Sequence, residues 1–269
     1  MKPFSTVIST LGLAATLVAA PAGAQTPDAG RPAPILHVHT DYRSCYFDLH
    51  PELTKDEFKE FAGELGSILR FRQLGDATTL GKGKVDVSVQ YTSSSIDDGK
   101  GAWNNTMSHP AADHYLGRSI EFPRLVARVG VSDRVDIGAW GGLNPNANYG
   151  LVGLDSKIVL MRQGPSKPVS ISIRPSVASL VGPAEIWAGS ASVDVSVSRA
   201  FGAFAPYVGF ATTGALAVER SNDVDLDPIF AEDSIAYAGL TYSVRGIQLS
   251  AEVEKGALVS YGFRIGKRF

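Results

Sequence analysis

The chain has 269 residues; 19% of them are charged, 28 are glycine, and the formal net charge is -2. This apolar, glycine-rich composition is not that of a disordered chain, and a net charge near zero gives no general electrostatic attraction for nucleic acid. We therefore expect no nucleic-acid partner. The single cysteine, Cys45, excludes a disulfide framework within the chain.

The N-terminus has the three regions of a secretory signal peptide. Lys2 precedes an apolar run, and small residues precede a cleavage position after Ala24. The apolar run is shorter than the roughly 20 residues that a membrane-spanning helix needs. We therefore expect a signal peptide over 1–24, a proline-rich flexible leader over 25–34 and one further domain over 35–269.

One segment carries helical signals. Thr54 is a predicted N-cap and Glu57 follows three residues later, which is the pattern of a capping box. Phe58 and Phe61 then follow at helical spacing. The sequence therefore predicts a short amphipathic helix near 54–63.

Elsewhere the dominant period of the sequence is two. The run "SVDVSVS" at 192–198 alternates valine with serine or aspartate at every position, and similar alternation recurs at 84–91, 169–174 and 247–254. Such runs are typical of strands with one apolar and one polar face. In chain order, the predicted strands cover 63–74, 83–94, 119–131, 134–143, 149–162, 168–180, 186–200, 203–219, 232–243, 246–254 and 258–269.

The lengths of these strands favour a membrane barrel over a soluble sandwich. Several predicted strands reach ten or more residues, whereas a strand of about 9–11 residues crosses a bilayer at a tilt and an ordinary strand has about 5–6. The apolar faces carry few charges, as contact with lipid demands. We expect the helix near 54–63 to pack on this barrel or at its mouth.

Charged residues gather on the other faces of the strands, and we expect them to line the lumen. Both signs are present in similar numbers, which favours a lumen crossed by salt bridges over a strongly ion-selective pore. The predicted lumen-lining residues are Arg70, Arg72, Asp86, Arg124, Arg128, Asp136, Asp155, Lys157, Arg174, Asp194, Glu252, Glu254 and Arg264.

The chain ends in "ALVSYGFRIGKRF", in which Tyr261, Phe263 and Ile265 alternate with other residues and Phe269 is last. This ending resembles the C-terminal strand of Gram-negative outer-membrane β-barrel proteins, in which the assembly machinery reads a strand with a terminal aromatic residue. The resemblance implies a place in the cell outer membrane. It implies two partners, the membrane lipid and the barrel-assembly machinery, with Tyr261, Phe263, Ile265 and Phe269 as the assembly signal.

The number of strands follows from closure of the barrel. Single-chain bacterial barrels usually have an even number of strands, and the list above has eleven. A further strand over 35–49 makes the number even. We therefore expect an all-β, up-and-down antiparallel transmembrane barrel of about twelve strands with one short N-terminal helix. The alternative is ten strands, with the first segments as a periplasmic or plugging element.

One polar stretch contains weak candidate metal ligands. His109, Asp113 and His114, with Asp97 and Asp98 nearby, supply imidazole and carboxylate groups of the kind that bind divalent metals. Their spacing matches no established ligand motif, and a polar loop over the barrel mouth explains them equally. We predict no metal site and no cofactor.

A barrel-based hydrolase is the least favoured of the functional hypotheses. Ser108 precedes His109, but neighbours in sequence point apart and no G-x-S-x-G motif supports a nucleophile. We predict no catalytic residue and no enzyme activity.

Two functions of a barrel remain. We expect a passive channel or transporter for small solutes or hydrophobic compounds. The alternative is a structural or interaction barrel with a closed lumen, because a barrel of about twelve strands is near the size at which side chains fill the interior. A continuous lumen with measurable conductance would favour the first function, and a lumen blocked by arginine and glutamate pairs would favour the second.

Overall fold

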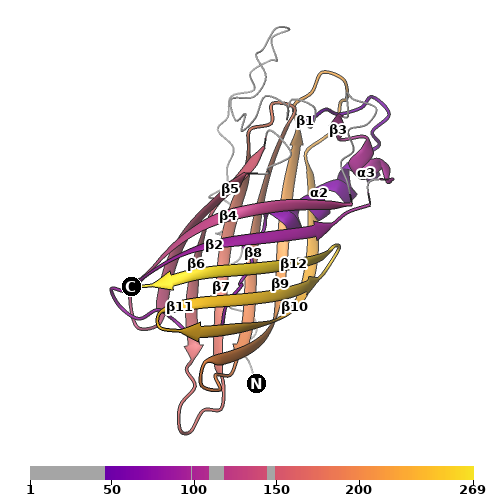
Figure 1. Cartoon of the computed structure of the whole chain (residues 1–269). Coiled ribbons are helices and arrows are strands. Elements are labelled where there is room, and N and C mark those ends of the chain that lie inside the picture. Colours follow the sequence, from indigo (N-terminus) through magenta and orange to yellow (C-terminus); the bar gives the residue numbers. More distant parts are fainter. Residues whose placement is uncertain (1–45, 98, 109–117, 144–148) are drawn as a thin grey trace, which may run out of the picture. The chain divides into compact units, whose positions relative to one another are not determined.

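The computed structural model describes residues 46–97, 99–108, 118–143 and 149–269. Within them, ten strands form a closed antiparallel barrel, in which pairing of the last strand with the first completes the ring (Figure 1). In chain order the strands are β2 (Val85–Ser95), β4 (Ser119–Gly130), β5 (Val135–Leu143), β6 (Gly150–Met161), β7 (Ser170–Val181), β8 (Ile186–Ser198), β9 (Phe204–Glu219), β10 (Ile229–Val244), β11 (Ile247–Lys255) and β12 (Val259–Arg268).

The predicted antiparallel barrel is confirmed, but the expected count of twelve strands is wrong and the alternative count of ten is correct. The predicted strand over 63–74 is the end of a helix and the irregular segment after it. Of the predicted strand over 35–49, residues 35–45 lie outside the described residues. Tyr46–Phe47 forms β1, which pairs with β3 (Met107–Ser108) in a separate two-stranded sheet.

Alternation of buried and exposed residues produces the barrel wall. In β8 the side chains of Ser192, Asp194 and Ser196 are buried, whereas Val195 between them is 44% exposed. In β11 every second residue is buried in the same way. Because the strands close into a ring, the polar faces point into the lumen and the apolar faces form the outer surface.

The two ends of the barrel carry different connections. The turn end holds the connections after β4, β6, β8 and β10 and the C-terminal Phe269. Its two-residue turn after β10, Arg245 and Gly246, has positive φ at both positions (48° and 81°), as a type I′ hairpin turn requires. The loop end holds the other connections, among them the one between β2 and β4 that contains β3 and the short helix α3 (Gly101–Asn104).

The helix α2 (Lys55–Leu69) begins at the predicted N-cap but extends well beyond the predicted end. The Thr54 hydroxyl accepts a hydrogen bond from the Glu57 N–H (3.3 Å), and the Glu57 carboxylate accepts one from the Thr54 N–H (2.9 Å). The hydrogen bonds from Thr54 lower the pKa of Glu57. No helix in the described part of the chain is both long and apolar enough to cross a membrane.

Glycine residues let α2 lie against the inner face of the wall. A Cβ placed on Gly66 would lie 2.5 Å from the Cβ of Ala215 in β9, and one placed on Gly63 would lie 3.5 Å from the Cβ of Ala231 in β10. Ala215 and Ala231 belong to the buried, inward rows of their strands. The helix therefore lies inside the barrel, on the wall formed by β9 and β10.

After α2 the chain continues through the lumen to the turn end. There the Gly83 N–H donates to the carbonyl oxygen of Gly130 (2.8 Å), and β2 begins two residues later. We call residues 55–83 the lumenal plug. The plug enters at the loop end, leaves at the turn end and leads directly into the first strand of the wall.

Candidate functional site

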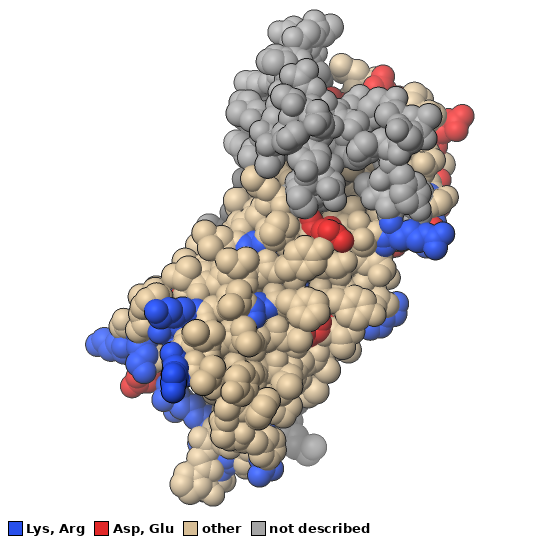
Figure 2. All heavy atoms as spheres, in the orientation of Figure 1, with Lys and Arg blue, Asp and Glu red and all other residues tan. Residues whose placement is uncertain are grey.

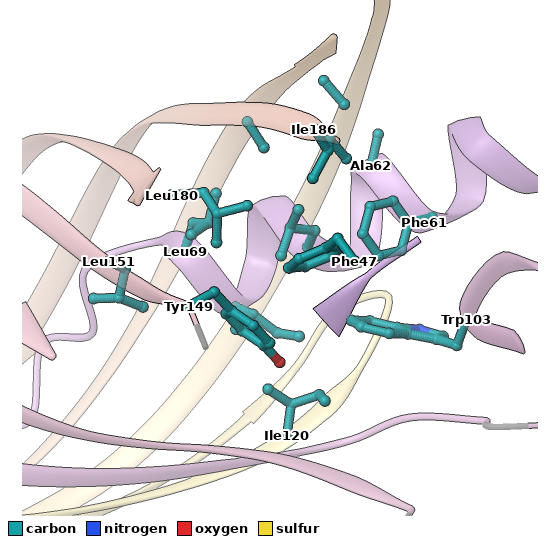
Figure 3. Close-up of a cluster of buried hydrophobic side chains, with 14 of the residues drawn as sticks. Phe47, Phe61, Ala62, Leu69, Trp103, Ile120, Tyr149, Leu151, Leu180 and Ile186 are labelled. Carbon is teal, nitrogen blue, oxygen red and sulfur yellow. The ribbon is translucent and has the colours of Figure 1, made fainter. Parts of the chain in front are cut away.

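The lumen is the candidate functional site, and an aromatic cluster closes its loop end (Figure 3). Phe61 of α2 packs edge-on against Trp103 of α3 (ring centroids 5.0 Å apart) and against Phe47 of β1 (5.9 Å). Phe47 in turn contacts Tyr149 at 4.8 Å. The cluster joins the plug to two loop connections, so that apolar side chains fill this end of the barrel.

A buried carboxylate sits at the edge of the aromatic cluster. The indole Nε1–H of Trp103 donates to Oε2 of Glu64, on α2, at 2.5 Å. Removal from water raises the pKa of the Glu64 carboxyl, and the hydrogen bond from Trp103 partly opposes this rise. This hydrogen bond to the Glu64 carboxylate holds α3 against the plug.

The middle of the lumen is organised around Arg70, at the end of α2. Its Nη1 donates to Asp194 of β8 at 2.6 Å, and its Nη2 bonds to Glu254 of β11. Arg72 approaches the other oxygen of Glu254 with its Nε at 2.8 Å. All four side chains are buried. Two arginines of the plug are thus paired with carboxylates from two separate strands.

A third arginine binds the end of the helix. Arg124 of β4 donates to the carbonyl oxygens of Ile68 (2.6 Å) and Arg70 (2.9 Å). The last carbonyl groups of a helix have no partner within it and favour a cation. The guanidinium of Arg124 also lies 5.1 Å from the ring centroid of Trp140. Arg124 therefore contacts both the plug and a neighbouring strand of the wall.

Beyond Arg72 the plug is held to the wall by polar contacts. Gln73 donates to Ser196 (3.0 Å), the Ala77 N–H donates to Ser198 (3.0 Å), and the Leu80 N–H donates to the carboxylate of Asp136 (3.1 Å). Together with Gly83, these contacts continue to the turn end. The plug therefore touches the wall along its whole path.

Further ion pairs link neighbouring wall strands around the plug. Asp155 pairs with Arg128 (2.8 Å) and lies 3.7 Å from Arg174. Asp86 pairs with Arg264 at 2.5 Å. Charges of both signs therefore neutralise one another inside the lumen. The arrangement is a network of paired charges and not a field of one sign that selects ions.

The structure places the thirteen predicted lumen-lining residues inside the barrel. Twelve are buried and Arg264 is partly buried. The origin of two of them differs from the expectation, because Arg70 and Arg72 belong to the plug and not to a wall strand. They point outward from the centre of the lumen, toward the carboxylates of the wall.

Sequence reasoning missed several residues of this interior. Asp76 and Gln73 of the plug are buried, and Asp76 accepts a hydrogen bond from the Thr78 N–H at 2.9 Å. No spacing signal marks them. Tyr207 and Tyr237 are also buried, and their rings are 6.5 Å apart. Their positions in the inward rows of β9 and β10 are a signal that the alternation of those strands could have supplied.

One cavity adjoins the plug in the turn half of the lumen. Its volume is about 30 Å³, and it is lined by Asp76, Asp86, Arg128, Lys157 and other residues. That volume holds about one water molecule. The cavity is far smaller than a path for a solute.

The weak metal candidates cannot be assembled from the described residues. His109, Asp113, His114 and Asp98 lie outside them, and Asp97 is exposed. Among the described residues, no group of three or more histidine, cysteine, aspartate and glutamate side chains is arranged to hold a metal ion.

The predicted assembly signal lies on the outer surface. Tyr261, Phe263 and Ile265 are exposed in alternation along β12, and Phe269 is 66% exposed. The backbone of Phe269 exchanges two hydrogen bonds with Val85 at the start of β2, at 2.8 and 3.3 Å. The last residue of the chain therefore takes part in closing the barrel.

No protein-family model matches this chain, and no curated protein matches it. Solved structures do match. An outer membrane channel from Pseudomonas putida F1 is 11% identical, with 72% of this chain and 98% of that chain covered and a TM-score of 0.40. LpxR from Salmonella typhimurium is 10% identical, with 68% and 99% covered and a TM-score of 0.36. The N-terminal β-barrel domain of Pseudomonas aeruginosa OprF is 11% identical, with 70% and 99% covered and a TM-score of 0.30.

Proposed function

We propose that the protein is an outer-membrane β-barrel whose lumen is closed by its own N-terminal segment, and that it acts as a structural or interaction barrel. The outward faces of its strands support the membrane location. Leu125 of β4 is 60% exposed and Phe263 of β12 is 58% exposed, and on the face shown in Figure 2 most of the surface between the two ends carries no charge. An apolar surface of this extent is stable against lipid and not against water.

The observation that carries the closed state is the pairing of Arg70 with Asp194 and Glu254 across the middle of the lumen. The pairing places a plug residue between two strands of the wall, with the aromatic cluster above it and the polar contacts of residues 73–83 below it. Solute would have to displace all three layers. The proposed function therefore does not rely on free diffusion through the lumen.

A gated channel is the second candidate, and one observation favours it. The turn half of the plug is held by hydrogen bonds to Ser196, Ser198 and Asp136, and a water-sized cavity adjoins it. Hydrogen bonds to water replace such contacts at small net free-energy cost. Small solutes could then pass only after the plug has left the lumen, and the strands of the wall could stay in place.

The membrane location is tested on the full chain in cells. We expect the protein in the outer-membrane fraction, and we expect the detergent-extracted protein to run faster on an unheated gel than on a heated one. Recovery in the periplasmic fraction, or a mobility that heating does not change, would contradict the proposal.

The closed lumen is tested separately, by conductance of the purified protein in a planar bilayer. We expect no steps of current with the unmodified chain. Steady open steps in every insertion would contradict the closed state and favour an open channel. Brief, infrequent steps with the unmodified chain would favour the gated channel.

Export and assembly complete the proposal. We propose cleavage near Ala24 and recognition of β12 and Phe269 by the barrel-assembly machinery. Phe269 is exposed while its backbone pairs with Val85, and its ring lies on the outer surface. Deletion of Phe269 should lower the amount of folded barrel in the membrane, measured by the heat-dependent gel shift. Normal amounts would argue against this role.

A further inference from the structure

The outer wall has a hollow over the four strands β10, β11, β12 and β2. Its volume is about 500 Å³ and its exposed lining is almost entirely apolar. We call it the outer groove, and its walls include Val89, Tyr91, Leu240, Leu249, Ala251 and Phe263. A cavity of this size is in the range of sites that bind small apolar molecules.

The groove exists because one small side chain stands between large ones. Ala251 pairs in register with Leu240 on β10 and with Phe263 on β12, and Phe263 pairs with Tyr91 on β2. Cross-strand partners in one row have Cβ atoms about 5 Å apart, so the methyl group of Ala251 leaves a gap between the two larger neighbours.

The groove leads toward a pair of basic residues at the turn end. Ile247 pairs with Lys267, and Arg245 forms the turn that precedes Ile247. Arg245 and Lys267 are both exposed. Among the described residues neither forms an ion pair, and the Lys267 ammonium lies over the ring of Phe269, 5.1 Å from its centroid. The two cations are thus available to an anionic group.

These two residues belong to a larger basic rim. Basic side chains gather near the turn end, where the C-terminus lies in Figure 1 (Figure 2). Exposed acidic residues among the described connections of this end are limited to Asp133. The exposed basic residues of the rim are Lys82, Lys84, Arg134, Arg162, Lys167, Arg199, Arg245 and Lys267. The rim therefore attracts anions, and only its part near Lys267 adjoins the groove.

The spacing between groove and cations falls within one leaflet of a bilayer. Ala251 and Ile247 are four residues apart on β11, which is about 13 Å along a strand and about 10 Å of depth at the usual strand tilt of a membrane barrel. Half of the hydrocarbon core of a bilayer is about 15 Å. A molecule with its headgroup at Lys267 would therefore place an acyl chain across Ala251.

We propose that the outer groove binds an anionic phospholipid of the leaflet at the turn end, with one acyl chain over Ala251 and the phosphate between Lys267 and Arg245. The inference rests on the proposed membrane location. Charge complementarity selects an anionic headgroup over a zwitterionic one, because the zwitterionic headgroup brings a cation of its own to the basic pair.

The test is native mass spectrometry of the full chain in mild detergent, with phosphatidylglycerol or phosphatidylcholine added at equal concentration. We expect a bound phosphatidylglycerol that survives detergent removal and little bound phosphatidylcholine. Ala251→Phe should abolish the adduct by filling the groove. Lys267→Gln and Arg245→Gln should each weaken it by about fivefold, since one cation near an anionic lipid surface contributes about 1 kcal/mol.

Matched controls carry the same changes elsewhere on the wall. Ala127→Phe alters an exposed alanine of β4, and Lys167→Gln alters an exposed lysine of the rim away from the groove. Both variants should bind phosphatidylglycerol like the unmodified chain. Equal binding of the two lipids, or an adduct that persists in Ala251→Phe and in Lys267→Gln, would overturn the proposal. Because detergent replaces the membrane in this experiment, a negative result leaves the fractionation test of the membrane location intact.

Discussion

Gly66 of α2 faces Ala215 of β9 so closely that a Cβ at position 66 would lie 2.5 Å from the Cβ of Ala215. Gly66→Ala should therefore destabilise the docked helix, because overpacking costs about 1–3 kcal/mol and exceeds the roughly 1 kcal/mol gained in helix propensity. Gly66→Leu should displace the plug. The measurements are the midpoint of the heat-dependent gel shift for the alanine variant and planar-bilayer conductance for the leucine variant.

Gly63 supplies the matched control for this prediction. A Cβ there would meet Ala231 at 3.5 Å, an ordinary contact distance. Gly63→Ala should leave the midpoint unchanged or raise it slightly. If both alanine variants behave alike, the close contact between Gly66 and Ala215 does not hold the plug.

Removal of the Arg70 charge should be strongly destabilising. Arg70→Met leaves Asp194 without its ion-pair partner in a buried place, and an uncompensated buried charge costs about 3–5 kcal/mol. The free energy of unfolding in urea, followed by tryptophan fluorescence in detergent, measures the loss.

The double variant Arg70→Met with Asp194→Asn separates charge from packing. It should recover part of the lost stability, because the second change removes the carboxylate that the first one isolates. A double variant whose loss equals the sum of the two single losses would show that the two residues are not coupled.

Opposite ends of the barrel should react differently with a membrane-impermeant maleimide in intact cells. Glu52, which precedes α2 at the loop end, and Arg245, at the turn end, are both exposed. Outer-membrane barrels have short periplasmic turns and longer extracellular loops, so we expect the loop end to face outward. In a Cys45→Ser background, Glu52→Cys should be labelled and Arg245→Cys should be labelled only after the outer membrane is permeabilised. The reverse pattern would mean that the plug enters from the periplasmic side.

The buried carboxyl of Glu64 should give the plug a pH dependence. Its pKa is raised above the ordinary value of 4.5 because burial penalises the charged form. The folded state therefore binds more protons than the unfolded state just above that ordinary value, and stability falls as pH rises through this window. Glu64→Gln keeps an oxygen acceptor for Trp103 and should flatten the dependence, measured as the urea midpoint between acidic and neutral pH. Lys59→Gln, an exposed change on the same helix, should leave the slope as it is.

The wall of this barrel is predictable from sequence because the outer surface and the lumen impose opposite demands on neighbouring residues. Serine and valine at 192–198 can satisfy both demands only as an extended strand, and β8 has that form. The buried arginines and carboxylates of the wall follow from the same rule. The ion-pair partners of these residues cannot be predicted in this way, because the two members of a pair are distant in the chain, as Arg70 and Glu254 show.

The sequence predicts only the first part of the plug, as a helix, and there is a physical reason for this. Ile68, Arg70 and Arg72 alternate with other residues as a strand would, but Phe71 and Arg72 are both buried. A segment surrounded by wall on every side has no exposed face, so period two loses its meaning there. The glycines at 63 and 66 also weaken the helical signal, and their use becomes visible only beside Ala215 and Ala231.

The pairing of Phe269 with Val85 constrains the order in which the molecule forms. Val85 begins the strand that follows the plug, so the last bonds of the ring are made beside the exit of the plug. If the ring closed first, the chain up to Leu69 would have to be threaded through a finished cylinder from the turn end. Threading is avoided if a curved open sheet first wraps around α2 and the barrel then closes by pairing of β12 with β2. In this order of events, the barrel forms around α2, and the same helix then blocks the lumen.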